Sequence, residues 1–230
     1  MKEVKIKVYN FNDLKEDIKE KLIKEEIDIQ CQDYCEFFLK NDMEEKASIL
    51  LEEYFNIKNG CDNVYYDLSY CQGSGSMIEF TINIYDLNKK YNILTDEELR
   101  FIQDKGVIND IHIKHNGSNY YHEYCFKVEY DDNFGYWSYE DIKEDYNIKE
   151  EEFNTIEDRI INLLDDYNKL YSKSAFIKDI GLMNENLTKY GYGLIENEEN
   201  FKEGAINYLK ENGILYYEDG RIFNYNYEEV

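Results

Sequence analysis

The sequence predicts an α+β fold, in which an antiparallel sheet built from two central hairpins is packed with helices. Two β-rich segments interrupted by glycine turns occupy the middle of the chain, and amphipathic helical patterns precede and follow them. Of the 230 residues, 43% are hydrophobic and 16% aromatic, which is enough apolar material for a sizeable core. We therefore expect one large folded domain or two small ones.

The first sixty residues predict one strand followed by helices. Apolar and polar residues alternate over residues 3–9, as in a half-buried strand. Apolar residues then recur at helical spacing over 14–23, and further helical stretches are expected at 31–40 and 44–56.

The first hairpin and a short helix come next. Residues 64–71 and 77–85 predict two strands joined by a glycine turn. Thr95 and Glu98 have the spacing of a capping box, so a short helix is expected to begin there and to end near Gly106.

The second predicted hairpin joins residues 107–115 to 119–130 through Asn116-Gly117-Ser118 and contains all three histidines.

An even loop around Gly117 would place a possible hairpin site on one face: His115, Tyr120 and His122, with Ile113 beside them and His112 on the other face. Two histidines within reach of each other could bind a metal or shuttle a proton. No fixed nucleophile or carboxylate spacing accompanies the pair. We therefore favour side chains hydrogen-bonded to neighbouring Tyr or Glu residues.

The C-terminal part predicts helices separated by irregular segments. A long loop with a turn of helix is expected over 131–152, and a strong amphipathic helix over 151–172. Glycines interrupt the weak pattern of 173–200. A helix over 200–211 and a hairpin over 214–225, turning at Asp219-Gly220, complete the chain.

We place a main α+β domain at residues 1–172 and a small C-terminal helix-hairpin subdomain at 173–230, although both could form one continuous domain. The first residues lack the apolar run of a signal peptide, and no stretch approaches the roughly 18 apolar residues of a membrane span. We therefore expect a protein of the bacterial host cytoplasm that does not bind membranes.

The net charge is the strongest physical feature of the chain. Fifty Asp and Glu against 26 Lys and Arg give a formal charge of -24. Such a surplus repels nucleic acid and anionic membranes and attracts basic surfaces. The expected partner is therefore a protein with a basic nucleic-acid-binding surface, and no direct binding of nucleic acid is expected.

The acids concentrate in residues 131–160, which hold eleven Asp and Glu against three Lys and Arg, with aromatic residues between them. This segment predicts either a solvated face whose aromatics pack inward or an anionic interaction surface with aromatic anchors. The residues expected to bind a partner, including a second acidic cluster, are Asp131, Asp132, Trp137, Tyr139, Glu140, Asp141, Glu144, Asp145, Glu150, Glu151, Glu152, Glu196, Glu198 and Glu199.

Cofactor and metal motifs are not expected. The five cysteines have scattered spacing, and no ligand pair near Cys31 and Cys35 completes a zinc set. The turn at 72–76 lies between two strands, whereas a nucleotide loop should open a helix, so we interpret it as a hairpin turn rather than a phosphate cradle. The acidic run also lacks the spacing of a calcium loop. We expect neither a cofactor nor a catalytic residue.

Three short motifs carry a resemblance. Residues 69–76 read Ser-Tyr-Cys-Gln-Gly-Ser-Gly-Ser, residues 113–117 read Ile-Lys-His-Asn-Gly, and residues 120–123 read Tyr-Tyr-His-Glu. They resemble an uncharacterised family common in phages and prophages, which shows a Ser-Gln-Gly-Asp-Gly turn and a Lys-His-x-Gly…Tyr-Tyr-His-Glu hairpin. A long helix and a short Glu-Asp-Gly hairpin follow in that family, the latter here at 218–220.

The resemblance covers residues 64–130 and, more loosely, 153–225. Ser74 stands where the family has Asp, so any ligand that this Asp would hold is not expected here. The resemblance implies a mobile-element origin. By class and composition, the chain is also similar to small acidic phage proteins that inhibit host defence, including anti-CRISPR and anti-restriction DNA mimics.

Three functions remain open at this point. The first is a phage-encoded inhibitor that occupies a basic nucleic-acid channel of a host defence complex by charge mimicry. The second is an antitoxin-like or other protein-binding module that uses a Tyr- and Trp-rich surface. The third, which we favour least, is a His-dependent enzyme that acts on a nucleotide or other small signal.

Overall fold

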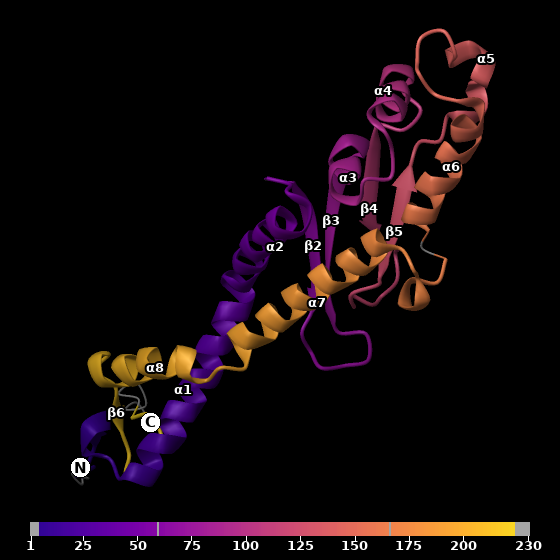
Figure 1. The fold of residues 1–230 in the computed structure, drawn as a ribbon. Helices are drawn as coiled ribbons and strands as arrows, with labels where there is room; N and C mark the ends of the chain where they lie inside the picture. Colours follow the sequence, from indigo (N-terminus) through magenta and orange to yellow (C-terminus); the bar gives the residue numbers. More distant parts are fainter. Residues whose placement is uncertain (1–4, 59, 166, 224–230) are drawn as a thin grey trace, which may run out of the picture. The chain divides into compact units, whose positions relative to one another are not determined.

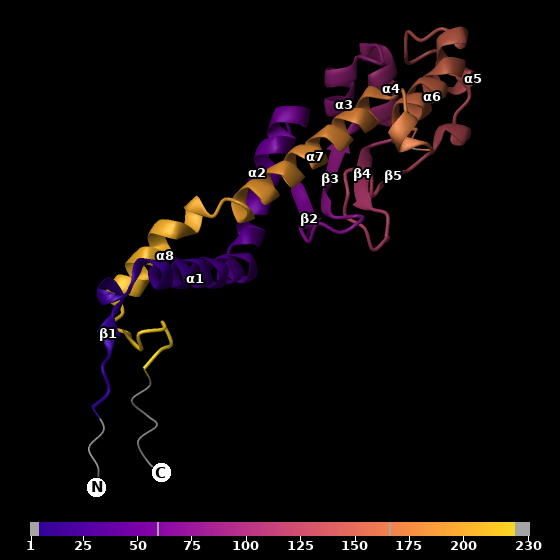
Figure 2. The ribbon, with the colours of Figure 1, turned by 90° about the horizontal axis from the view of Figure 1, so that it is seen from below.

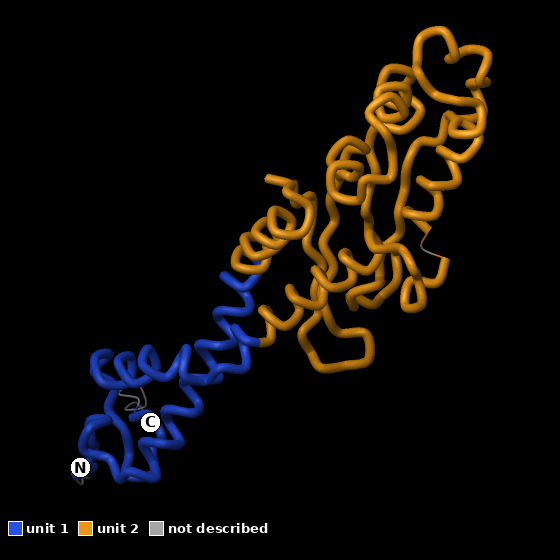
Figure 3. The backbone as a smooth tube through the Cα atoms, viewed as in Figure 1, with its two compact units in different colours: residues 1–40, 193–230 blue, residues 41–192 orange. Residues whose placement is uncertain are grey.

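The computed structural model describes residues 5–58, 60–165 and 167–223 and confirms the α+β class. The chain divides into two compact units: a larger one of residues 41–192 and a smaller one of residues 1–40 and 193–230 (Figure 3). The helices are α1 (Glu16–Phe37), α2 (Leu39–Phe55), α3 (Ile84–Tyr91), α4 (Asp96–Lys105), α5 (Tyr139–Ile142), α6 (Glu150–Leu164), α7 (Ala175–Ile195) and α8 (Glu199–Glu211). The strands are β1 (Tyr9–Asn10), β2 (Cys61–Asp67), β3 (Gly75–Asn83), β4 (Asp110–His115), β5 (Phe126–Tyr130) and β6 (Leu215–Tyr216).

The two predicted hairpins form one antiparallel sheet in the larger unit, in the order β2-β3-β4-β5. The central pairing joins β3 to β4, so that Phe80 lies opposite Ile113. Ile78, Phe80 and Ile82 alternate along β3 and are buried, whereas the intervening Glu79 and Thr81 are half-buried. The period of two therefore separates an apolar face from a polar face.

Helices α2 and α7 both lie against this sheet (Figures 1 and 2) and pack on its apolar face. The ring of Phe55 at the end of α2 stacks on Phe80 with a centroid distance of 5.2 Å. Phe176 of α7 meets the same Phe55 ring edge-on at 5.8 Å. These rings form part of the core that fixes α2 and α7 on β3.

The expectation that glycines break residues 173–200 is wrong, because α7 runs through Gly181 and Gly191. A Cβ at Gly181 would lie 2.7 Å from the Tyr124 ring, and one at Gly191 would lie 2.9 Å from a methyl of Leu68. The glycines permit close packing instead of ending the helix. Residues 175–192 thus pack within the larger unit, and the expected division at 172/173 falls inside it.

The smaller unit joins the two ends of the chain. Its core consists of Phe11, Leu14, Leu209 and Tyr216. Helix α1 packs on α8, and β1 pairs with β6 in a two-stranded sheet separate from the central one. The helix predicted at 200–211 is confirmed, and it lies with the N-terminal helix instead of forming a C-terminal subdomain of its own.

Several predicted boundaries differ from the structure. The strand expected at 3–9 is reduced to Tyr9–Asn10, because only these residues find a partner in β6; residues 3 and 4 lie outside the described part of the chain. The helices expected at 14–23 and 31–40 are one continuous helix, α1, since no Pro or Gly interrupts them. The helix expected at 151–172 ends at Leu164.

Local side-chain hydrogen bonds account for two further differences. Residues 84–85, expected in a strand, begin the unpredicted helix α3, because the Asn83 side chain accepts a hydrogen bond from the Asp86 N–H at 2.8 Å and caps it. The terminal hairpin is shorter than expected: β6 pairs with Ile222 through a single bridge across the turn at Gly220, and residues 224–225 lie outside the described residues.

Candidate functional site

The predicted acidic segment forms one ordered part of the larger unit. It leaves β5, makes a short 3-10 turn at Phe134–Tyr136 and continues through α5 into the first turns of α6 (Figure 1). We call its exposed carboxylates the acidic surface. They are Asp131, Asp132, Glu140, Asp141, Glu144, Asp145, Glu150, Glu151 and Asp158.

The aromatic residues of this segment mostly pack inward. Tyr146 is buried and meets Phe101 of α4 edge-on at 5.6 Å, and its hydroxyl donates to Asp104 at 3.1 Å. Trp137, expected as a partner anchor, is half-buried under the Lys105 ammonium at 4.9 Å. Tyr139, the other expected anchor, is also half-buried, with its ring tilted 48° to that of Phe153 at 6.4 Å.

Some of the carboxylates are committed to the local fold. Asp141 accepts hydrogen bonds from the backbone and side chain of Ser138, which lowers the pKa of Asp141. Glu152 accepts from the Lys149 N–H at 3.1 Å and so caps α6. These contacts hold the backbone of the acidic surface in place. Glu152 is half-buried and is therefore not part of that surface.

Five carboxylates of the acidic surface are unpaired within the described part of the chain. There, no side-chain hydrogen bond or ion pair links Asp131, Glu144, Glu150, Glu151 or Asp158 to another residue. By contrast, Glu140 pairs with Lys143, Asp145 lies 3.9 Å from the Lys105 ammonium, and Asp132 accepts from the Phe134 N–H at 3.1 Å. The larger unit has a net charge of -16, and residues 131–160 supply -8 of it from a fifth of the unit's length. The negative charge of this unit is therefore concentrated in one segment rather than spread evenly.

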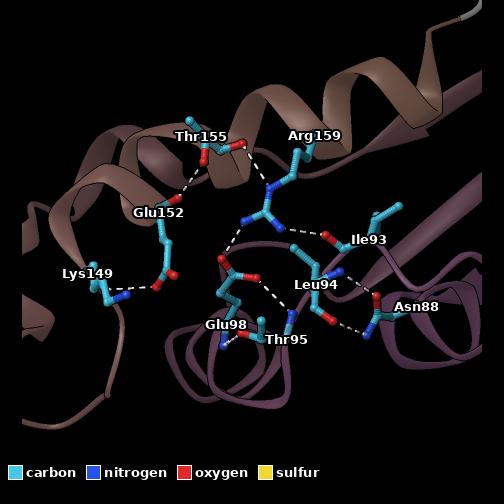
Figure 4. Close-up of polar contacts among 9 residues, drawn as sticks. All are labelled: Asn88, Ile93, Leu94, Thr95, Glu98, Lys149, Glu152, Thr155 and Arg159. Atoms are coloured by element: carbon cyan, nitrogen blue, oxygen red, sulfur yellow. Dashed lines mark hydrogen bonds and ion pairs between the residues drawn. The ribbon is translucent and has the colours of Figure 1, made fainter.

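A buried ion pair fixes α6, and with it the acidic surface, to α4 (Figure 4). Glu98 is 1% exposed and pairs with the guanidinium of Arg159. Arg159 also donates to the Ile93 carbonyl at 2.7 Å, while the second oxygen of Glu98 accepts from the Thr95 N–H at 2.8 Å. The last contact belongs to the predicted capping box, which is confirmed. The partner Arg159 could not be assigned to it from the sequence.

The second acidic cluster lies in the other unit. Glu196, Glu198 and Glu199 are exposed at the start of α8, and Glu199 pairs with Lys202 at 2.9 Å. These residues belong to the smaller unit, whereas the acidic surface belongs to the larger one.

The two segments that carry the family resemblance meet in space. The Tyr121 N–H donates to the Gly73 carbonyl at 2.9 Å, and a Cβ at Gly73 would lie 2.0 Å from the Tyr120 ring. Gly75, with φ of +153°, leaves no room for a side chain because the His122 Cα would be 2.9 Å away. The glycines of the first turn thus serve close packing against residues 120–122.

The histidine geometry expected from an even hairpin loop is wrong. The strands end at His115 and resume at Phe126, which is the partner of His115 in the ladder, so His122 lies in a long loop. The His115 ring accepts from the Gly117 N–H at 3.2 Å and lies 2.9 Å from the Tyr120 carbonyl, to which its other nitrogen donates. It also stacks on Tyr65 at 4.8 Å.

These contacts occupy both ring nitrogens of His115, which acts as a brace of the loop. The Nδ1 of His122 accepts from the Tyr124 N–H at 3.3 Å, and His112 lies on the polar sheet face, 3.0 Å from the Thr81 hydroxyl. The histidines are therefore hydrogen-bonded to neighbouring groups, although these are mainly backbone groups rather than the Tyr and Glu side chains expected.

Asn184 is a residue that the sequence patterns missed. It is fully buried in α7, accepts from the Ile78 N–H at 3.1 Å and donates to the Glu123 carbonyl at 3.0 Å. Its amide therefore connects β3 with the loop between β4 and β5. The only sequence signal was a polar residue within an apolar helical stripe.

No set of three or more metal-ligating side chains occurs among the described residues, and all five cysteines are free. Within the same residues, no helix is both long and apolar enough to span a bilayer. In comparisons with known proteins, no family model, curated protein or solved structure matches the chain.

Proposed function

We propose that the protein is a phage-encoded inhibitor of a host defence complex, and that its acidic surface occupies a basic nucleic-acid-binding groove of that complex. The observation that carries the proposal is the concentration of unpaired carboxylates on an ordered segment. Duplex DNA presents one charge per roughly 1.7 Å of axis, so a mimic needs carboxylates that stay in place.

Three features support a fixed arrangement of these charges. Tyr146 and Trp137 contact α4, the caps hold the turns of the segment, and the ion pair of Glu98 with Arg159 attaches α6. A carboxylate held on an ordered backbone loses less conformational entropy on binding than one on a mobile chain. The high negative charge also steers association with a basic partner.

The test is inhibition of DNA cleavage by a panel of purified CRISPR effector nucleases and restriction endonucleases. A variant with five substitutions neutralises the unpaired carboxylates. A matched control neutralises five exposed acids elsewhere, so both variants carry the same net charge. The test set is Asp131→Asn, Glu144→Gln, Glu150→Gln, Glu151→Gln and Asp158→Asn; the control set is Glu20→Gln, Glu45→Gln, Glu53→Gln, Asp110→Asn and Glu203→Gln.

We expect the test variant to lose at least about fivefold in inhibition, since five surface charge pairs contribute roughly 1–5 kcal/mol together. The control should keep wild-type inhibition, and wild-type affinity should fall steeply between low and moderate salt. Equal losses in both variants, inhibition insensitive to salt, or no inhibition of any nuclease in the panel would contradict charge mimicry.

A protein-binding module that uses tyrosines is the second candidate, and exposed rings beside the motif turn favour it. Tyr70 is 64% exposed and stacks on Tyr192 at 4.6 Å, and Tyr120 is 50% exposed over Gly73. Exposed, pre-positioned tyrosines are common binding anchors. If Tyr70→Ser with Tyr120→Ser abolishes activity while the five-fold acid variant retains it, this candidate replaces the first.

A further inference from the structure

Two cysteines lie one helical turn apart on α1 of the smaller unit. Cys31 and Cys35 are separated by four residues, so their side chains leave the same face of the helix. Cys31 is half-buried, with its thiol 3.7 Å from the Ile195 carbonyl that precedes α8, and Cys35 is exposed. Cys31 is therefore held by a contact within the unit, whereas Cys35 is open to solvent.

Residues four apart on a helix are neighbours on its surface, so the two thiols can approach each other on this face. Neither residue joins a disulfide. An intact helix holds side chains four residues apart with about 5–6 Å between Cβ atoms, whereas a disulfide needs roughly 3.5–4.5 Å. The helix thus keeps the pair as thiols and leaves space for one bridging atom.

The ligand set selects the kind of ion. Zinc in structural sites takes four ligands, and hard ions take oxygen. No third His, Cys, Asp or Glu completes a cluster here among the described residues. Two thiolates without further ligands suit a soft ion that accepts a low coordination number, which among biological metals is monovalent copper.

The structure assigns to Cys31 and Cys35 a two-thiolate site for a soft monovalent ion of the Cu(I) class. Binding forms two metal–sulfur bonds and releases the proton of each thiol to solvent, with no change of oxidation state. The two cysteines belong to the smaller unit, whereas the acidic surface belongs to the larger one.

The test is anaerobic competition of the reduced full-length protein with the coloured Cu(I)–bicinchoninate complex. We expect wild type to remove one Cu(I) per chain, and Cys31→Ser or Cys35→Ser each to lose that uptake. Cys71→Ser removes an exposed thiol of the larger unit and should keep it. Retention by either of the first two variants, or loss by Cys71→Ser, would overturn the assignment.

A relocation variant separates the pair geometry from thiol number and from folding. Cys35→Ser combined with Glu36→Cys keeps five thiols but turns one off the shared face, and both positions are exposed. We expect it to lose Cu(I) uptake while it keeps the wild-type circular dichroism and unfolding curve. Wild-type uptake by this variant, or one ion shared by two chains, would exclude the site within one helix.

Discussion

Removing the guanidinium of Arg159 tests whether one buried ion pair attaches α6 to the rest of the larger unit. Arg159→Met keeps an unbranched apolar stem but leaves Glu98, at 1% exposed, without its cation. Breaking a buried pair from one side costs about 3–5 kcal/mol. The Arg159 side chain is 36% exposed, so water partly compensates and we expect the lower end, about 3 kcal/mol.

The assay is urea unfolding of the full chain, with hydrogen exchange of the α6 amides as a local readout. The α6 amides should lose protection before those of β3. Glu98→Gln in the Arg159→Met background provides the control, because Gln retains the acceptor for the Thr95 N–H and removes the buried charge. We expect this double variant to recover about 1–2 kcal/mol of the loss.

A loss below about 1 kcal/mol for Arg159→Met, or a double variant less stable than the single one, would refute this account. The first result would mean that α6 is held by its apolar contacts alone. The second would mean that Glu98 contributes through contacts other than Arg159.

Three further outcomes follow from other contacts. Gly75→Ala should destabilise by about 1–3 kcal/mol in thermal unfolding, because φ is +153° and the His122 backbone is too close, whereas Gly193→Ala, with nothing within 4 Å, should not destabilise. Asn184→Ala should cost about 1–3 kcal/mol for each of its two orphaned backbone partners, measured by urea unfolding. Lys114 and Lys127 hold the pKa of Glu129 at about 2; because this lies below the unfolded value near 4.5, its stabilising effect is present above that value and is lost as pH falls toward 2. An NMR titration of Glu129 should give this pKa, and the pKa should rise in Lys127→Met. An unchanged pKa in that variant would contradict the contact of Lys127 with Glu129. Unchanged stability of Gly75→Ala or of Asn184→Ala would contradict the contacts described for those residues.

Local patterns predicted the elements whose causes are local. The capping box of Thr95 and Glu98 and the glycine turn of the first hairpin depend on neighbours a few residues away, and both are present. By contrast, the role of Gly181 could not be predicted, because a glycine that ends a helix and one that admits a ring from a distant loop have the same local sequence.

The candidate site was predicted in outline only. The acidic run at 131–160 can be recognised from composition alone, and most of its carboxylates are exposed in the structure. The direction of Trp137 was not visible, because an interleaved aromatic can point to a partner or to its own protein. The prediction that His115 and His122 share one face was wrong, because it depended on a loop length that no short motif determines.

By itself, the sequence determined the class of fold, the excess of negative charge and its concentration in one segment, since these follow from composition and from periods of two and 3.6 residues. The tertiary structure alone decided that α7 passes through its glycines onto the sheet, that both chain ends share one small core and that Arg159 pairs with Glu98. Each of these rests on contacts between residues far apart in the chain, which no local pattern encodes.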